Sequence, residues 1–424
     1  MGQSSDSPIL HLPPFHYLNN RLHCESVSLP ALAAEFGTPL YVYSAHRIRE
    51  NYRRLDSAYA PLKATICYSV KANSNLSILR LLKGEGAGFD IVSGGELFRA
   101  LKIGAEPGRI VFAGVGKTEA EIEFALKSKV GWINVESEGE LRRVSAVATR
   151  LGVEACVAIR LRPDVEADTH QHISTGSAAS KFGVPLAAAL GMVRLQLPNV
   201  SIRGAHVHIG SQLGSSQATL QAIGAALEFV SSARQFGVEI DALNIGGGFP
   251  VAYRDDDAPP SIEAFAEPIV SRLESWPGRI ILEPGRSVVA DAGALLTTVQ
   301  YEKFDGQHRL VVVDAGMHTL IRPALYEAYH RVWPVTHTPA GNMRYSAAVA
   351  GPICESADFL ARDRSLPLLS AGDRLAILDV GAYGFSMASN YNSHPLPAEV
   401  LVDGDSCWLI RQRQSLDSLV RDEE

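Results

Sequence analysis

The sequence predicts two domains. The first is an α/β domain at residues 38–286, a closed (β/α)8 barrel of the TIM type. The second is an all-β domain, a β-sandwich or Greek-key domain. The second domain combines residues 287–424 with residues 1–37. Three observations predict this division. The 424 residues exceed what a single hydrophobic core usually serves. Short β-branched runs alternate with longer helical patterns from about residue 38, and this alternation stops after Arg286.

The barrel is predicted from eight apolar runs, each followed by a helical or loop segment. A first strand at residues 40–43 precedes them, and helical stretches such as residues 75–84 and 219–237 separate them. The runs are TICYSV (65–70), GFDIV (88–92), RIVFAG (109–114), WINVE (132–136), EACVAIRL (154–161), IRGAHVHI (202–209), ALNIG (242–246) and RIILE (279–283). Eight such units are the number that closes a barrel.

The second domain is predicted from short strands that follow one another without regular helices. They are RLVVVDAG (309–316), RYSAAVAGP (344–352), DRLAILDVGAYG (373–384) and AEVLVDGDSCWLI (398–410). Residues 16–29 have the same strand-like pattern, so we expect the N-terminal segment to pair with this domain.

Composition excludes several classes of protein. The formal charge of −7 comes without a Lys/Arg-rich run, so nucleic acid is not expected as a partner. The five cysteines are odd in number and contain no CxxC pair, which argues against a disulfide framework and a zinc ribbon. The sequence shows no secretory leader and no apolar stretch long enough for a membrane span. We therefore expect a cytoplasmic protein with free thiols.

Polar residues at the ends of the barrel strands are the first candidates for a site, because active sites in such barrels lie at that face. They are Lys71, Asp90, Ser93, Arg160, His208, Ser211, Gly246, Gly247, Gly248, Glu283, Pro284, Gly285 and Arg286. Lys71 in YSVKAN follows an apolar strand, where a poorly solvated amine can form a Schiff base. The alternative is a lysine whose stem packs on the strand end while its ammonium reaches solvent.

The other strand ends provide groups that suit a phosphorylated pyridine cofactor. Gly246, Gly247 and Gly248 in NIGGGFP can present backbone N–H groups to an anion, assisted by the Ser211 hydroxyl and the Arg286 guanidinium. Glu283 in EPGR can accept a hydrogen bond from a pyridine nitrogen and keep the ring protonated, which strengthens it as an electron sink. An ordinary ion pair or turn at EPGR is the alternative.

Two HxH pairs require a metal site to be considered. His206 and His208 share one face of a strand, and His170 and His172 repeat the spacing in a loop. A metal-dependent hydrolase on a (β/α)8 barrel uses such a pair with further ligands. The remaining strand ends offer Lys, Ser, Gly and Arg instead of ligands, so we predict no metal and assign His208 to stacking on a cofactor ring.

Eight motifs together resemble the fold-type III pyridoxal 5'-phosphate (PLP) decarboxylases, and among them the diaminopimelate decarboxylases. They are YSVKAN, FDIVSGGEL, HVHIGSQ, NIGGGFP, EPGR, DAGMHTLIRPALYEAYH, GPICESADFL and GAYGFSMASNYN, in the family's order from about residue 38 onward. The resemblance implies decarboxylation of meso-2,6-diaminopimelate to L-lysine and CO2, the last step of lysine biosynthesis.

The resemblance also implies roles for individual residues. Lys71 would hold the cofactor as a Schiff base, Glu283 would partner the pyridine nitrogen, His208 would stack on the ring, and Asp90 and Arg160 would support it. The phosphate side would be held by Ser211, Gly246, Gly247, Gly248, Arg286 and Tyr383. Cys354 would donate the proton and, with Glu355, would come from the neighbouring subunit of a homodimer. A buried structural thiol is the alternative for Cys354.

The predicted substrate residues follow from a substrate that carries an ammonium and a carboxylate at its distal end. Arg322, Tyr326 and in part Arg286 would bind the carboxylate, and Glu355 the ammonium; Tyr383 is a further candidate. Ornithine and lysine lack the distal carboxylate that an arginine would pair with. Packing within the second domain is the alternative for Arg322 and Tyr326.

The family pattern is broken after DAGM, where His318 and Thr319 replace an asparagine and an acidic residue. This departure weakens the choice of substrate. A related decarboxylase of ornithine, arginine or carboxynorspermidine is therefore the nearest alternative, and a non-catalytic PLP-binding protein is an alternative of another class.

Overall fold

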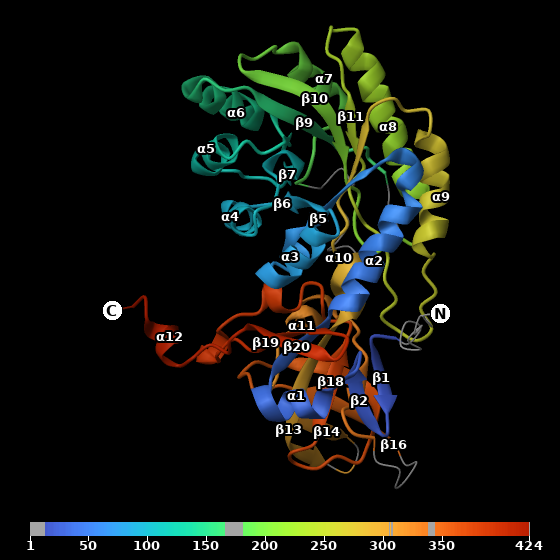
Figure 1. Ribbon diagram of the computed structural model, residues 1–424, viewed down its shortest axis with the longest axis vertical. Coiled ribbons are helices and arrows are strands. Elements are labelled where there is room, and N and C mark those ends of the chain that lie inside the picture. The colour runs from blue at the N-terminus through green and yellow to red at the C-terminus, as the bar shows by residue number, and fades with distance from the viewer. Residues whose placement is uncertain (1–12, 166–180, 305, 307, 338–343, 424) are drawn as a thin grey trace, which may run out of the picture. The chain divides into compact units, whose positions relative to one another are not determined.

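The computed structural model describes residues 13–165, 181–304, 306, 308–337 and 344–423 (Figure 1). The described residues form two compact units. One unit comprises residues 51–252 and 258–288, and the other comprises residues 13–50, 253–257 and 289–423, within these described ranges.

The first unit is a closed barrel of eight parallel strands, as predicted. Neighbouring strands follow the chain order, and pairing of the last strand with the first closes the barrel. The strands are β5 (Thr65–Ser69), β6 (Gly88–Ile91), β7 (Ile110–Phe112), β8 (Trp132–Val135), β9 (Ala155–Leu161), β10 (Val200–Val207), β11 (Ala242–Asn244) and β12 (Arg279–Leu282). Seven of the eight predicted runs contain one of them, and the run at residues 202–209 overlaps β10, which begins two residues earlier.

Helices follow the barrel strands along the chain (Figure 1). Hydroxyl residues begin several of them: the side chains of Ser93, Thr118, Ser137 and Ser261 each accept a hydrogen bond from the first helical turn. Ser93, a strand-end candidate, therefore caps a helix. α2 (Ala45–Ala58) precedes β5, and the helices that follow β5 to β12 are α3 (Leu76–Gly84), α4 (Gly94–Lys102), α5 (Glu119–Lys127), α6 (Glu138–Leu151), α7 (Leu186–Arg194), α8 (Gln217–Arg234), α9 (Ile262–Leu273) and α10 (Arg286–Val289).

The second unit is built around a nine-stranded sheet. Its strands are β4 (Leu40–Ser44), β13 (Gly293–Phe304), β14 (Arg309–Val313), β15 (Val332–Pro334), β16 (Arg344–Ala350), β17 (Phe359–Pro367), β18 (Arg374–Leu378), β19 (Ala398–Asp403) and β20 (Ser406–Arg411). Residues 40–43, which we expected within the barrel domain, lie in β4 between β13 and β19. All five residues of β4 are buried, so this strand is part of the sheet's core.

The N-terminal segment packs with this second unit, as expected. It contains β1 (Phe15–Leu18), β2 (Arg21–Cys24), β3 (Val27–Ser28) and α1 (Leu29–Phe36). The backbone N–H of Leu22 donates to the carbonyl of Val335 at 2.9 Å. Side chains of the N-terminal segment share an apolar core with β4, β13 and β19. The short helices α11 (Arg322–Tyr326) and α12 (Asp417–Val420) complete the unit.

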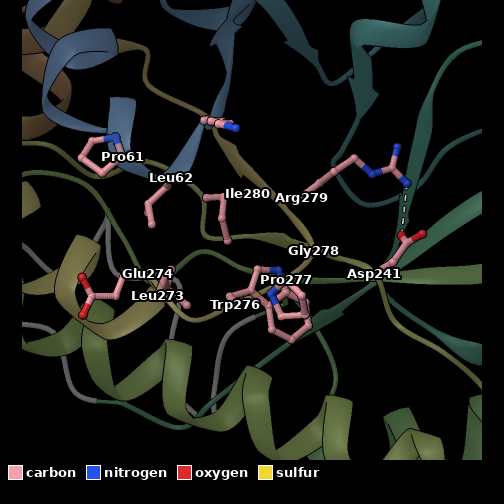
Figure 2. A pocket seen from close by; sticks show the side chains of 11 residues that line it. Pro61, Leu62, Asp241, Leu273, Glu274, Trp276, Pro277, Gly278, Arg279 and Ile280 are labelled. Atoms are coloured by element: carbon pink, nitrogen blue, oxygen red, sulfur yellow. Dashed lines mark hydrogen bonds and ion pairs between the residues drawn. The ribbon is translucent and has the colours of Figure 1, made fainter.

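A cavity of about 460 Å³ lies at the amino ends of β11 and β12 in the barrel unit (Figure 2). Its lining includes Trp276, Asp241 and Arg279, and the Arg279 guanidinium donates to Asp241 at 3.1 Å. This end of the barrel is opposite to the predicted site, which lies at the carboxyl ends. None of the helices in the described ranges is long and apolar enough to cross a membrane.

Candidate active site

Lys71 is paired with a buried carboxylate at the carboxyl end of the barrel. It lies in the turn Val70–Ala72 directly after β5. Its Nζ donates to Asp90 Oδ2 at 2.9 Å, and Ser69 Oγ donates to the same oxygen at 2.7 Å. The Asp90 side chain is fully buried, whereas 39% of the Lys71 side chain is exposed. Lys71 is therefore better solvated than we expected, because it lies beyond the strand end.

The environment of Asp90 suits a group that orients Lys71. Burial raises the pKa of Asp90 above its ordinary value, and the Lys71 ammonium offsets this shift only in part. The second oxygen, Oδ1, is buried and accepts no hydrogen bond from the described residues. Asp90 can thus hold the lysine with one oxygen while the other remains available to a bound molecule.

Glu283 is the centre of a buried polar network formed at the ends of four strands, β8, β10, β11 and β12. Asn244 Nδ2 donates to Glu283 Oε1 at 2.5 Å, and His206 Nε2 lies 3.3 Å from Glu283 Oε2. Asn134 Nδ2 lies 3.0 Å from His206 Nδ1, so the amide donates to this nitrogen and the ring proton is on Nε2, facing the carboxylate. The Glu283 side chain is only 5% exposed.

This network keeps Glu283 ionised. Burial alone raises the pKa of the Glu283 carboxyl, but the neighbouring His206 and the Lys71 ammonium outweigh it, so the pKa lies well below its ordinary value. A buried, ionised carboxylate is the group required opposite a protonated pyridine nitrogen.

His208 is held as a neutral imidazole. Burial, together with the nearby charges of Arg160 and Lys71, lowers the pKa of His208 to about 3. The hydrogen bonding agrees with this, because the Gly247 N–H donates to His208 Nδ1 at 3.2 Å and only an unprotonated nitrogen can accept it. A neutral aromatic ring at this position can stack on a planar cofactor.

The glycine turn after β11 depends on the absence of side chains. A Cβ on Gly247 would lie 2.3 Å from the carbonyl oxygen of Glu283, and Gly246 and Gly248 have φ values of +70° and +98°. Asn244 Oδ1 accepts the Gly246 N–H at 3.0 Å, which fixes the start of the turn. The turn is therefore held in one compact form.

The residues that follow β12 link this turn to the Lys71 turn. Arg286 Nε donates to Ser211 Oγ at 3.1 Å, so the structure brings these two predicted phosphate residues together. The carbonyl of Pro284 accepts the Ser69 N–H at 2.9 Å. A Cβ on Gly285 would lie 3.0 Å from the Ser69 Cβ, so this position also favours glycine.

Arg160 is buried at the end of β9 and is held from two sides. Its Nη1 donates to Glu136 Oε1 at 3.0 Å, and its guanidinium lies 4.6 Å from the centre of the Phe182 ring. Strand register places Arg160, His206 and Asn244 side by side on β9, β10 and β11. These contacts bring Arg160 into the same strand-end cluster as Glu283.

The HxH pair of β10 is used by the hydrogen-bond network. His206 faces Asn134 and Glu283, and His208 accepts from Gly247. In the described part of the chain, no group of three or more His, Cys, Asp or Glu side chains could hold a metal ion. His170 and His172 lie outside the described residues.

The barrel end fits PLP on observations of the site itself. It combines a lysine amine, an ionised buried carboxylate, a glycine turn with an adjacent Ser–Arg pair, and the available Asp90 Oδ1. These four features match an aldehyde, a pyridine nitrogen, a phosphate and a ring substituent, respectively.

The predicted substrate residues of the second unit differ in their exposure. Arg322 is 6% exposed; its Nη1 lies 3.0 Å from His330 Nε2, and its guanidinium lies 4.9 Å from the centre of the Tyr253 ring. The carbonyl of Leu378 accepts from His330 Nδ1 at 2.9 Å, so Nε2 is free of a proton and accepts from Arg322. Tyr326 ends α11 and is half-buried.

Cys354 and Glu355 are both exposed, which contradicts the alternative of a buried structural thiol. The Cys354 N–H donates to Asn392 Oδ1 at 2.9 Å. Tyr383 is half-buried, with a φ of +57°. These three residues belong to the second unit, so their roles toward Lys71 stay predictions.

The two residues that break the family pattern are buried in the second unit. His318 is 2% exposed, and its ring lies 4.6 Å from that of His394. Thr319 Oγ1 donates to the carbonyl of Gly316 at 2.8 Å, and Tyr41 donates to the Thr319 carbonyl. Both residues therefore have packing roles in this chain.

Three site residues were missed from the sequence. Asn134 and Asn244 hold His206 and Glu283, and Glu136 holds Arg160. All three lie at the ends of predicted strands, within WINVE and ALNIG. A polar residue inside an otherwise apolar run is the signal that could have found them.

Comparison with protein families gives a match over residues 45–290, to the pyridoxal binding domain of the pyridoxal-dependent decarboxylases. The chain is 46% identical over 404 residues to diaminopimelate decarboxylase of Neisseria meningitidis serogroup A, covering 95% of this chain and 98% of that protein. It is 44% identical over 409 residues to the Vibrio cholerae enzyme of the same name, covering 96% and 97%.

Solved structures agree with these matches. The crystal structure of diaminopimelate decarboxylase from Helicobacter pylori complexed with L-lysine has a TM-score of 0.89 and 40% identity, and the alignment covers 93% of this chain and 98% of that one. The crystal structure of diaminopimelate decarboxylase from m. jannaschi has a TM-score of 0.91 and 37% identity, and the alignment covers 97% of this chain and 98% of that one.

Proposed function

The chain belongs to the diaminopimelate decarboxylase family of pyridoxal-dependent decarboxylases, and we propose that it converts meso-2,6-diaminopimelate to L-lysine and CO2. It is a carboxy-lyase whose cofactor is PLP, and this reaction is the last step of lysine biosynthesis. The observation that carries the proposal is the pairing of Lys71 with buried Asp90 at the same barrel end as ionised Glu283.

The residues of the barrel end hold the cofactor in this proposal. Lys71 Nζ attaches it, Ser211 and Arg286 bind its phosphate beside the compact glycine turn, and Glu283 accepts the pyridine N–H. Neutral His208 stacks on the ring and adds no positive charge. When bound, PLP supplies the electron sink for the electron pair that the departing carboxylate leaves on the α-carbon.

Residues of the second unit act on the substrate. Arg322 binds the distal carboxylate, assisted by Tyr326, while Glu355 binds the distal ammonium. Tyr383 contributes to the phosphate and substrate side. Cys354 Sγ returns a proton to the α-carbon, which requires a thiol that is accessible, as the exposure of Cys354 permits.

We propose a homodimer in which Cys354 and Glu355 serve the site of the neighbouring subunit. This arrangement would give each exposed thiol a substrate to act on. The chain's cysteines are free thiols, which supports a reducing, cytoplasmic location.

Absorbance and activity of a Lys71→Ala variant test the proposal. The parent protein purified with PLP is expected to show the visible band of the lysine-bound cofactor and to release CO2 from meso-diaminopimelate. The variant should lose both, because no other amine replaces Nζ. An unchanged spectrum in the variant would contradict the assignment of Lys71. Lys63→Ala, at the opposite barrel end, is the matched control and should behave as the parent.

A further inference from the structure

One buried carboxylate closes the loop that carries Cys354. Asp358 is 3% exposed, and its Oδ2 accepts the backbone N–H of Ile353, the residue before Cys354, at 2.7 Å. The Gly351 N–H donates to the Asp358 carbonyl at 3.1 Å, so the two ends of the segment 351–358 are joined. The exposed thiol is thus carried on a closed and internally bonded loop.

The same carboxylate joins this loop to the one after β14. Asp358 Oδ1 accepts the Met317 N–H at 2.6 Å. A Cβ on Gly316 would lie 2.8 Å from this carboxylate, and one on Gly351 would lie 2.4 Å from it. Two glycines therefore allow Asp358 to enter between the loops, and both of its oxygens are used to bind backbone N–H groups.

Asn392 holds the other side of the thiol-bearing residue. Its Oδ1 accepts the Cys354 N–H at 2.9 Å. Asn392 has a φ of +53°, a conformation that asparagine adopts more readily than most residues. The Ser389 N–H donates to the His318 carbonyl at 2.9 Å, which anchors the segment that bears Asn392.

We propose that Asp358 and Asn392 are positioning residues for the Cys354 thiol. They bind two consecutive backbone N–H groups, those of Ile353 and Cys354, and so fix the direction in which the side chain of Cys354 leaves the loop. An exposed loop without such acceptors would let the thiol move, whereas proton transfer requires a donor held close to its target. This inference rests on the proposed function of Cys354 as proton donor.

Conservative substitutions separate positioning from folding. In Asp358→Asn the side-chain NH2 faces the backbone N–H of either Ile353 or Met317. Two donors then meet, so one of the two hydrogen bonds that the carboxylate accepts is lost. Asn392→Ala removes the acceptor at an exposed site and should fold normally, whereas Asn392→Asp retains an acceptor. Asp405→Asn, in the exposed turn between β19 and β20, is the matched control.

Steady-state kinetics of the PLP-loaded enzyme with meso-diaminopimelate give the main readout. We expect Asp358→Asn and Asn392→Ala to lower kcat about five- to tenfold, the effect of losing one hydrogen bond, with little change in KM. The solvent deuterium isotope effect on kcat should increase, because proton return becomes slower. Asn392→Asp should restore kcat, and Asp405→Asn should match the parent. A loss of thermal stability with unchanged kcat per bound cofactor would overturn the inference.

A Cys354→Ala background distinguishes failure of the inference from failure of the proposed function. If Cys354→Ala retains the parent's kcat, the role of the thiol is wrong. If Cys354→Ala loses activity, adding Asn392→Ala should lower kcat no further, because positioning acts only through the thiol. A further loss of the same size as in the parent background would show that Asn392 acts independently of Cys354 and would overturn the inference alone.

Discussion

Replacing Glu283 with glutamine tests how the barrel end supports its cofactor. Asn134 places the His206 proton on Nε2, which faces Glu283 Oε2 at 3.3 Å, and Asn244 donates to Oε1. Both sides of the carboxylate therefore face donors. In Glu283→Gln one of these donors meets the amide NH2, so the substitution removes a charge and sets two donors against each other.

The size of the effect follows from these contacts. Losing a hydrogen bond to a charged group costs about 1.5–3 kcal/mol. The donor that faces the glutamine NH2 is also left without an acceptor, so we expect the unfolding free energy of the cofactor-free protein to fall by about 2–4 kcal/mol. Loss of the charge that holds the pyridine proton should lower kcat about 10²- to 10³-fold, as for other preorganised electrostatic contacts.

CO2 release at saturating substrate measures kcat, absorbance shows that the variant is loaded with PLP, and urea unfolding measures stability. Glu274→Gln is the matched control, because Glu274 is exposed beside the cavity at the opposite barrel end (Figure 2). A fully loaded Glu283→Gln enzyme with a kcat within about twofold of the parent would refute the assignment of Glu283 to the ring nitrogen.

Three further predictions concern pH, the glycine turn and the distal subsite. Burial, assisted by His394, lowers the pKa of His318 to about 4, so the folded protein should lose stability as pH falls from about 6.5 toward 4. Urea midpoints across this range should fall less steeply in His318→Gln; an identical slope would contradict this. Gly247→Ala should weaken PLP affinity at least about tenfold, because the added Cβ would push the turn away from the Glu283 carbonyl. An absorbance titration measures this affinity, and an unchanged value would count against the turn as part of the phosphate site. Arg322→Lys should raise KM for meso-diaminopimelate about tenfold or more, since a lysine cannot reproduce a bidentate bond to a carboxylate, and an unchanged KM would remove Arg322 from the substrate subsite.

The barrel was predictable because its two signals are local. Each strand is an apolar run, and the change of pattern after Arg286 marks where the strand–helix alternation ends. The ends of these strands can be located from the sequence alone. Lys71, Asp90, Arg160 and Glu283 could therefore be chosen as site residues without knowledge of how the strands pair.

Features that depend on long-range contacts were not predictable. β4 has the same apolar pattern as a barrel strand, and only its pairing with β13 and β19 assigns it to the other sheet. The proton position on His206 depends on Asn134, 72 residues earlier in the chain. Asp358 lies near Cys354 in sequence, but its bond to Met317 across 41 residues could not be inferred from spacing.

The central claim is the reaction itself, and a substrate panel with CO2 detection tests it most directly. Purified, PLP-loaded protein is incubated separately with meso-diaminopimelate, ornithine, arginine, lysine and carboxynorspermidine, and CO2 and the amine product are measured. We predict CO2 and L-lysine in equal amounts from meso-diaminopimelate, and no comparable release from the substrates without a distal carboxylate. Faster release from ornithine, arginine or carboxynorspermidine than from meso-diaminopimelate would contradict the account.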